Sequence, residues 1–145
     1  MKGQFKIYKK SGAAQFSLLD PQVNDKGFLS KEGAILVELA KGAGTDSDGN
    51  IIVDWSKKIS FAINMADICN LIDETKTSQK LVHNYKGSTK TLEFIPGKDK
   101  YEGTYMLSAS EGENRATVPL SNGEYNMIMR LLVSVAAPRI IGWQN

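Results

Sequence analysis

The chain has 145 residues, 41% of them hydrophobic, and its 18 Lys and Arg against 16 Asp and Glu leave a formal net charge of +2 at pH 7. This length predicts a single domain, and the small net charge excludes a protein that binds polyanions through a large overall excess of positive charge. One cysteine and one histidine exclude an intrachain disulfide and the common zinc sites, which need three or four ligands.

The first half of the chain predicts four strands. Polar and apolar residues alternate over residues 4–9, as is typical of a strand with one buried side, and residues 13–19 predict a second short strand. Residues 33–40 are apolar enough for a strand or a buried helix, and the glycines around them favour the strand. A long fourth strand is expected over residues 51–63, with a bend near Trp55.

The second half repeats this order, and each half ends in a helix. The strands of the second half are predicted over residues 80–85, 89–95, 105–109 and 115–118. Asn64 is the expected N-cap of the first helix, which ends near residue 72. Ser121 and Glu124 have the spacing of a capping box for the second helix, and Pro138 is expected to end it.

The repeated order predicts an α+β fold with two antiparallel four-stranded sheets, each followed by a helix. Residues 1–145 form one domain with an internal structural repeat, divided into about residues 1–76 and 77–145. Helices on one side of such a sheet leave its other side uncovered. Lys6 and Tyr8 alternate away from the apolar positions and are expected on that side. A sheet face that is simply exposed to water carries the same residue types. The alternation alone therefore fits both a binding face and an ordinary solvated face.

Two regions in matching places of the two halves carry motifs in a specific order. The first consists of GFLSKEGAILVELAKGAG (residues 27–44) and VDWSKKISFAINMADICNLI (residues 53–72), and the second is TVPLSNGEYNMIMRLLVSVAAPRIIGW (residues 117–143). With their x-E-G, D-W-S-x-K and terminal P-x-x-x-G-W patterns, these regions resemble the Whirly family of single-stranded-DNA-binding proteins. Together with the N-terminal strands they cover nearly the whole chain.

The resemblance implies an open pair of four-stranded sheets packed on helices, and a homotetramer whose core is formed by the helices of neighbouring protomers. It also implies that single-stranded DNA lies along the sheets and between protomers with little sequence preference. The same fold occurs in mitochondrial guide-RNA-binding proteins, so RNA stays open as a partner. The family's Lys-Gly-Lys-Ala-Ala-Leu motif, which is associated with larger assemblies of tetramers, matches only partly at residues 9–15.

Binding of single strands requires cations for the phosphates and flat side chains on which bases stack. Tyr8 and Phe28 are the candidates for stacking. The candidates for phosphate contacts are Lys6, Lys9, Lys10, Lys31, Lys57, Lys58 and Lys90. Each lysine taken singly is explained as well by a solvated side chain, so the prediction depends on the cluster.

The remaining residues of types that can serve in catalysis, metal binding or stacking are interpreted as parts of the fold. Trp55 and Trp143 are interpreted as packing anchors, Cys69 as a small buried hydrophobic residue, and His83 as an ordinary surface or packing residue. The sequence contains no Walker or Rossmann phosphate loop and no set of nucleophile, base and orienting group. We therefore predict no catalytic residue, no cofactor and no metal site.

The leading hypothesis is a non-catalytic, largely sequence-nonspecific single-stranded DNA-binding protein that protects or organises exposed strands in replication, recombination or repair. The alternatives are an RNA-binding or transcription-regulatory protein on the same fold and, from another class, an enzyme or small-ligand protein. No apolar run approaches the 18 residues of a membrane span, and residues 1–10 do not have the pattern of a signal peptide. The expected location is cytoplasmic or nucleoid-associated in a bacterium or phage, or organellar if a presequence has been removed.

Overall fold

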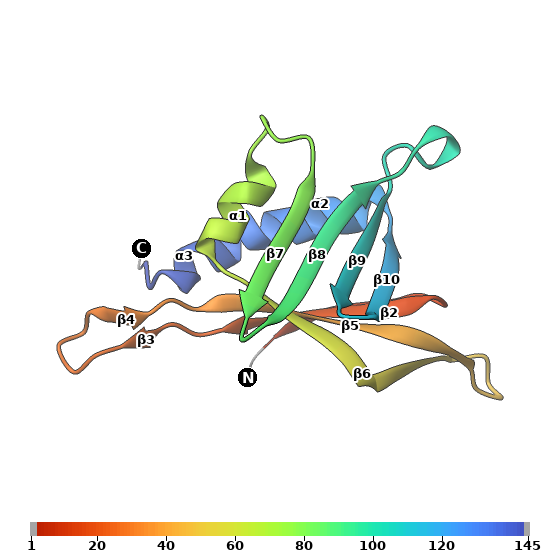
Figure 1. Cartoon of the computed structure of the whole chain (residues 1–145), viewed down its shortest axis with the longest axis horizontal. Coiled ribbons are helices and arrows are strands. Elements are labelled where there is room, and N and C mark those ends of the chain that lie inside the picture. The colour runs from red at the N-terminus through yellow and green to blue at the C-terminus, as the bar shows by residue number, and fades with distance from the viewer. Residues whose placement is uncertain (1–2, 144–145) are drawn as a thin grey trace.

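The computed structural model describes residues 3–143, and in it two four-stranded antiparallel sheets cross each other beside a helical segment (Figure 1). The strands of the first sheet, in their order across it, are β1 (Gln4–Tyr8), β2 (Gly12–Leu19), β5 (Ala34–Thr45) and β6 (Ile51–Ile63). Those of the second sheet are β10 (Asn114–Leu120), β9 (Tyr105–Glu111), β8 (Ser88–Pro96) and β7 (Gln79–Tyr85). The predicted pair of antiparallel four-stranded sheets is confirmed.

A two-stranded ribbon that the sequence did not predict interrupts the first half. It consists of β3 (Gln22–Val23) and β4 (Leu29–Lys31) and extends from one end of the molecule in Figure 1. The Asn24 side chain closes its turn by accepting hydrogen bonds from the backbone N–H groups of Lys26 and Phe28. Because of this ribbon, the expected order of four strands and one helix in each half is not matched.

The helical elements are α1 (Met65–Ile72), the short 3₁₀ turn η1 (Asp99–Tyr101), α2 (Asn122–Arg130), the π-helical η2 (Leu131–Ala136) and α3 (Ala137–Ile140). Of these, α1 and α2 begin as their capping residues predict. Asn64 and Asp67 form a reciprocal capping box at α1, and Ser121 and Glu124 form one at α2. None of the helices within residues 3–143 is long and apolar enough to cross a membrane.

Pro138 does not end the second helical segment, contrary to the prediction. The helical backbone continues from α2 through η2 and α3 to Ile140. Pro138 lies in the first turn of α3 and has no N–H, so it donates no hydrogen bond to the preceding turn of this continuous helix. The widened π-helical turns of η2, just before it, change the local hydrogen-bond register so that the proline ring is accommodated.

The core lies between the inner sides of the two sheets and the helical segment. Phe61 of β6, Phe94 of β8 and Ile128 of α2 belong to it, and none of them is more than 1% exposed. The sheets approach closely at Gly12, where a Cβ atom would lie 2.6 Å from the carbonyl oxygen of Thr117 in β10. Glycine at this position therefore allows β2 to pack directly on the second sheet.

Candidate nucleic-acid interface

The register of the first sheet gives it a buried side and an outer face. The buried row across its four strands is formed by Ile7, Ala14, Leu39 and Ile59. The neighbouring row on the opposite side, which we call the outer face, is formed by Lys6, Gln15, Glu38 and Ser60. The helices lie on the buried side of this sheet (Figure 1). Lys6 and Tyr8 therefore occupy the side on which the alternation predicted them.

Glu38 places a nearly buried carboxylate in the middle of the outer face, with 7% of the residue exposed. Its Oε1 accepts a hydrogen bond from Nε2 of Gln15 at 2.9 Å, and its Oε2 forms an ion pair with Nζ of Lys58. Burial alone would raise the pKa of Glu38, but the hydrogen bonds from Lys58 and Gln15 and the charge of Lys58 outweigh it and hold that pKa below its ordinary value. Lys58 is thus anchored on the face by a charged partner.

Tyr8 and Trp55 form an aromatic pair at this face. Their ring centroids are 6.4 Å apart and the planes meet at 81°, an edge-to-face contact. Trp55 lies in a bulge of β6. Between the pairs Leu39–Ile59 and Lys41–Asp54, β5 contributes a single residue, whereas β6 contributes the four residues 55–58. The predicted bend near Trp55 is confirmed. The ring of Trp55 packs on Tyr8, which agrees with its interpretation as a packing residue, but it is only partly buried and is not part of the core.

Three further candidate lysines are exposed near this pair or on the same face. Lys6 lies on the outer face, Lys10 in the turn between β1 and β2, and Lys57 in the bulge of β6. Within the described residues none of the three forms an ion pair. Their charges are therefore available for phosphate groups.

Lys9 and Lys90 already have partners elsewhere in the fold. Nζ of Lys9 lies 3.0 Å from a carboxylate oxygen of Glu124, at the start of α2. Nζ of Lys90 donates to the carbonyl oxygen of Ser60 at 3.0 Å and lies 3.5 Å from Glu111, so it ties β8 to the first sheet. Both side chains therefore stabilise the fold. Their contacts with phosphate, expected from the sequence, stay a prediction.

Phe28 and Lys31 are not brought together with Tyr8. Phe28 lies in the turn of the β3–β4 ribbon and is 68% exposed, and Lys31 ends β4. In Figure 1 this ribbon extends from the end of the molecule opposite to the β5–β6 turn. A strand that contacts Phe28 would follow a different part of the surface from one that contacts Tyr8 and Trp55.

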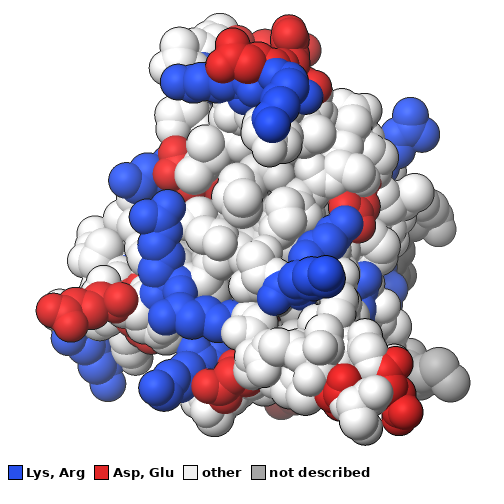
Figure 2. All heavy atoms as spheres, turned by 90° about the vertical axis from the view of Figure 1, so that its right-hand side faces the viewer, with Lys and Arg blue, Asp and Glu red and all other residues white. Residues whose placement is uncertain are grey.

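The charges of the molecule gather in groups. Figure 2 looks at the right-hand side of Figure 1 and shows Lys and Arg side chains over the left part of this face and near its centre, with uncharged side chains between them, and others at the top and at the right-hand edge. Carboxylates lie at the top, the left-hand edge and the bottom of this face, and others lie directly beside the cations. Although the net charge of the chain is only +2, cations are therefore concentrated locally on this side of the molecule.

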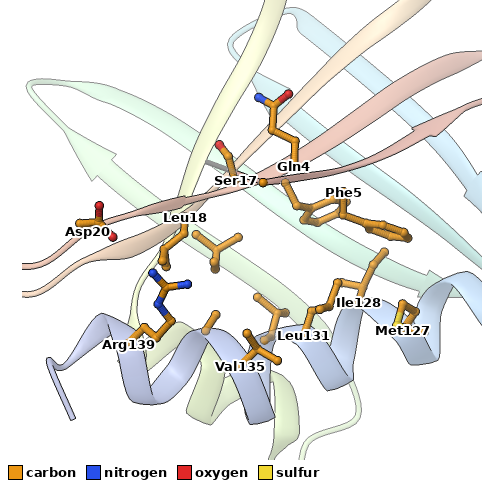
Figure 3. A pocket seen from close by; sticks show the side chains of 15 residues that line it. Gln4, Phe5, Ser17, Leu18, Asp20, Met127, Ile128, Leu131, Val135 and Arg139 are labelled. Carbon is orange, nitrogen blue, oxygen red and sulfur yellow. The ribbon is translucent and has the colours of Figure 1, made fainter. Parts of the chain in front are cut away.

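An apolar groove of about 660 Å³ lies between the helical segment and the edge of the first sheet. Phe5 and Leu18 line it from the sheet, and Leu131 and Val135 line it from η2 (Figure 3). Arg139 marks the end of the groove that is nearer to Leu18 in the same view. This groove offers a surface for another apolar element.

Two exposed tyrosines that the sequence argument did not single out lie at loops of the second sheet. Tyr85 is 71% exposed and Tyr101 is 59% exposed. The ammonium of Lys86 lies 5.3 Å from the ring centroid of Tyr85, and that of Lys100 lies 5.1 Å from that of Tyr101. An aromatic residue next to lysine at a turn, as in Tyr85-Lys86-Gly87, was the signal that could have found them.

Two structural interpretations from the sequence are wrong. Trp143 is 67% exposed and is not a buried anchor, and Cys69 is exposed on α1. His83 packs its ring on Phe61, as a packing residue would, and its Nε2 also lies 2.8 Å from Oδ2 of Asp67 in the capping box of α1. Residues 3–143 contain no group of three or more His, Cys, Asp or Glu side chains that could hold a metal ion.

One family model matches most of the chain, and several solved structures have a similar fold. A family model described as "Whirly transcription factor" matches residues 7–131. Among solved structures, the fold is similar to WHY1 from Arabidopsis thaliana, with a TM-score of 0.78, 23% identity, and coverage of 99% of this chain and 87% of that chain. No curated protein sequence matches the chain.

Two further solved structures show the same likeness. WHY3 from Arabidopsis thaliana has a TM-score of 0.75 and 22% identity, with coverage of 97% of this chain and 89% of that chain. The plant transcriptional regulator PBF-2 has a TM-score of 0.76 and 22% identity, with coverage of 99% and 84% respectively. At these identities the structures show a shared fold.

Proposed function

The chain belongs to the Whirly family, and on this premise we propose that it is a non-catalytic protein that binds single-stranded nucleic acid along the outer face of its first sheet. The observation that carries the proposal is the partly exposed pair of Tyr8 and Trp55 on a sheet side that the helices leave open. Lys6, Lys10 and Lys57 supply exposed cations on or near this face. Stacking rings and a cationic track are the two elements of single-strand binding.

Single-stranded DNA without strong sequence preference is the proposed ligand, and protection or organisation of exposed strands in replication, recombination or repair is the proposed role. Aromatic faces stack on every base, and lysines contact phosphates that carry no sequence information. A second role is favoured by the name of the matching family model and by the similar regulator PBF-2, which both refer to transcription. A transcription-regulatory protein of this fold would add a sequence preference to the same mode of binding.

We propose that the apolar groove is covered by the helical segment of a second copy, in a homotetramer. Met127 and Val135 are 48% and 51% exposed in the single chain, although both are apolar and line the groove. Apolar surface of this kind on a helix is stabilised when a neighbouring subunit removes it from water. The outer face of the first sheet lies away from this groove and stays accessible in such an assembly.

A binding titration against equal lengths of single-stranded DNA, duplex DNA and RNA tests the proposed ligand. Strong preference for single-stranded DNA across unrelated sequences supports the proposal. Preference for RNA, or for one DNA sequence over its scrambled version, supports the alternative roles. Equal affinity for the duplex would contradict the stacking argument, because paired bases do not expose their faces.

A further inference from the structure

A second hollow, which we call the hairpin crevice, lies between the outer face of β5–β6 and the tip of the β7–β8 hairpin. Leu36 and Ala62 line it from the first sheet, and Val82 and Tyr85 line it from the hairpin. Its volume of about 690 Å³ is within the range of about 300–1,000 Å³ that is typical of sites for small ligands.

The backbone of Tyr85 is held in a tight turn beside the hairpin crevice. It pairs with Ser88 across a two-residue turn in which Lys86 and Gly87 have φ angles of +49° and +78°. Positive φ at both central residues is the type I′ geometry that matches the twist of the flanking strands. The hairpin therefore presents a 71% exposed ring on a defined backbone, a surface suited to a flat ligand.

The hairpin crevice also holds polar atoms with unused hydrogen-bonding capacity. Nζ of Lys90 donates to the carbonyl oxygen of Ser60 and approaches Glu111 at 3.5 Å, which leaves one of its three protons available. Oδ1 of Asn84 accepts from Thr89, and the Asn84 amide protons have no partner among the described residues. A cation and an amide donor beside an exposed ring match the phosphate, the base edge and the base face of a nucleotide.

The hairpin crevice opens directly on the outer face of the first sheet. Ser60 belongs both to its lining and to the outer row that begins at Lys6. We propose that the hairpin crevice binds one nucleotide of a single strand that lies on the outer face, with the base stacked on Tyr85 and the phosphate at Lys90. This inference rests on the proposed function and assigns a defined subsite to it.

The test is an anisotropy titration of a labelled single-stranded DNA oligomer with the full chain and its variants. Tyr85→Ala is expected to raise the dissociation constant about 5- to 150-fold, the equivalent of about 1–3 kcal/mol for one stacked base, and Tyr85→Trp is expected to restore affinity. Tyr101→Ala is the matched control, because Tyr101 is also exposed beside a lysine but does not line the hairpin crevice. It is expected to change affinity by no more than about twofold.

Thermal melting of each variant shows that it is folded, which is expected because both tyrosines are exposed. The subsite is overturned if Tyr85→Ala binds like the parent, or if Tyr101→Ala weakens binding as much as Tyr85→Ala does. A parent chain that binds no single-stranded nucleic acid would instead overturn the proposed function, and this result is visible before any variant is compared.

Discussion

Tyr8 and Trp55 differ from the other aromatic side chains of the first sheet in where their rings meet. Phe5 and Phe16 meet at 6.1 Å on the buried side, where Phe16 is 7% exposed. Tyr8 is 45% exposed on the outer face. Water covers much of the Tyr8–Trp55 pair in the free chain, so a stacked base would gain apolar contact there without disturbing the core.

Tyr8→Ala is expected to weaken binding of single-stranded DNA by about 1–3 kcal/mol, because one stacking surface is lost. The loss should persist at high salt, since stacking does not depend on counterion release. Affinities measured by anisotropy at low and high salt check both statements. Tyr8→Phe keeps the ring and should bind like the parent; equal weakening by this variant would contradict the stacking role.

Glu38 controls the charge of the outer face, because it neutralises Lys58. Glu38→Gln removes the carboxylate and keeps a side chain of the same shape, which leaves the charge of Lys58 available to a phosphate. Affinity for single-stranded DNA should rise, and log K against log salt should become steeper by about 0.7. Titrations at several salt concentrations measure this slope. An unchanged slope would show that no phosphate reaches Lys58.

The stability of the same variant gives an independent check of the Glu38 ion pair. Because the folded pKa of Glu38 lies below its ordinary value, its charged form stabilises the fold above about pH 4.3, the ordinary glutamate pKa. This contribution is lost as the pH falls through the lowered pKa. Urea unfolding at pH 7 and pH 3 should therefore show a smaller pH dependence for Glu38→Gln than for the parent.

The secondary-structure elements that could be predicted from the sequence are those fixed by contacts close along the chain. The capping boxes at Asn64 and Ser121 span three residues and were found. The β3–β4 ribbon could not be found, because strands of two and three residues contain too little alternation to recognise.

The site was predicted only in part, because some of its contacts join residues that are far apart along the chain. Alternation placed Tyr8, but the contact of Trp55 with Tyr8 depends on the bulge in β6 and on pairing between distant strands.

His83 joins two elements that are sixteen residues apart along the chain. Its Nε2 lies 2.8 Å from Oδ2 of Asp67, and its ring stacks on Phe61 with centroids 4.1 Å apart. His83→Ala should lower the free energy of unfolding by about 1–3 kcal/mol, because the nearly buried Asp67 carboxylate loses a partner. Chemical denaturation measures this change. Asn84→Ala, at the exposed neighbouring position, should stay within about 0.5 kcal/mol of the parent.

At the scale of the whole molecule, the two hollows are lined by different kinds of side chain and suit different partners. The hairpin crevice combines an exposed ring with polar atoms, whereas the groove beside the helical segment is lined mainly by apolar side chains (Figure 3). Nucleic acid carries a charge at every phosphate and would find few partners in the apolar groove. Assembly through the groove and binding on the outer face can therefore occur together, and variants should separate them.

Val135→Lys is the variant that should break the assembly and leave the chain folded. Val135 lines the groove and is 51% exposed in the single chain, so lysine is tolerated there in a monomer but would bring an unpaired charge into an apolar interface between copies. Light scattering should give the parent a mass four times the 15.9 kDa of one chain and the variant a smaller mass. Met106→Lys is the control, because Met106 is similarly exposed at 37% on β9 and does not line the groove. A parent that is monomeric at micromolar concentration, or a Val135→Lys variant that keeps the parent's mass, would show that the groove is not the contact between copies.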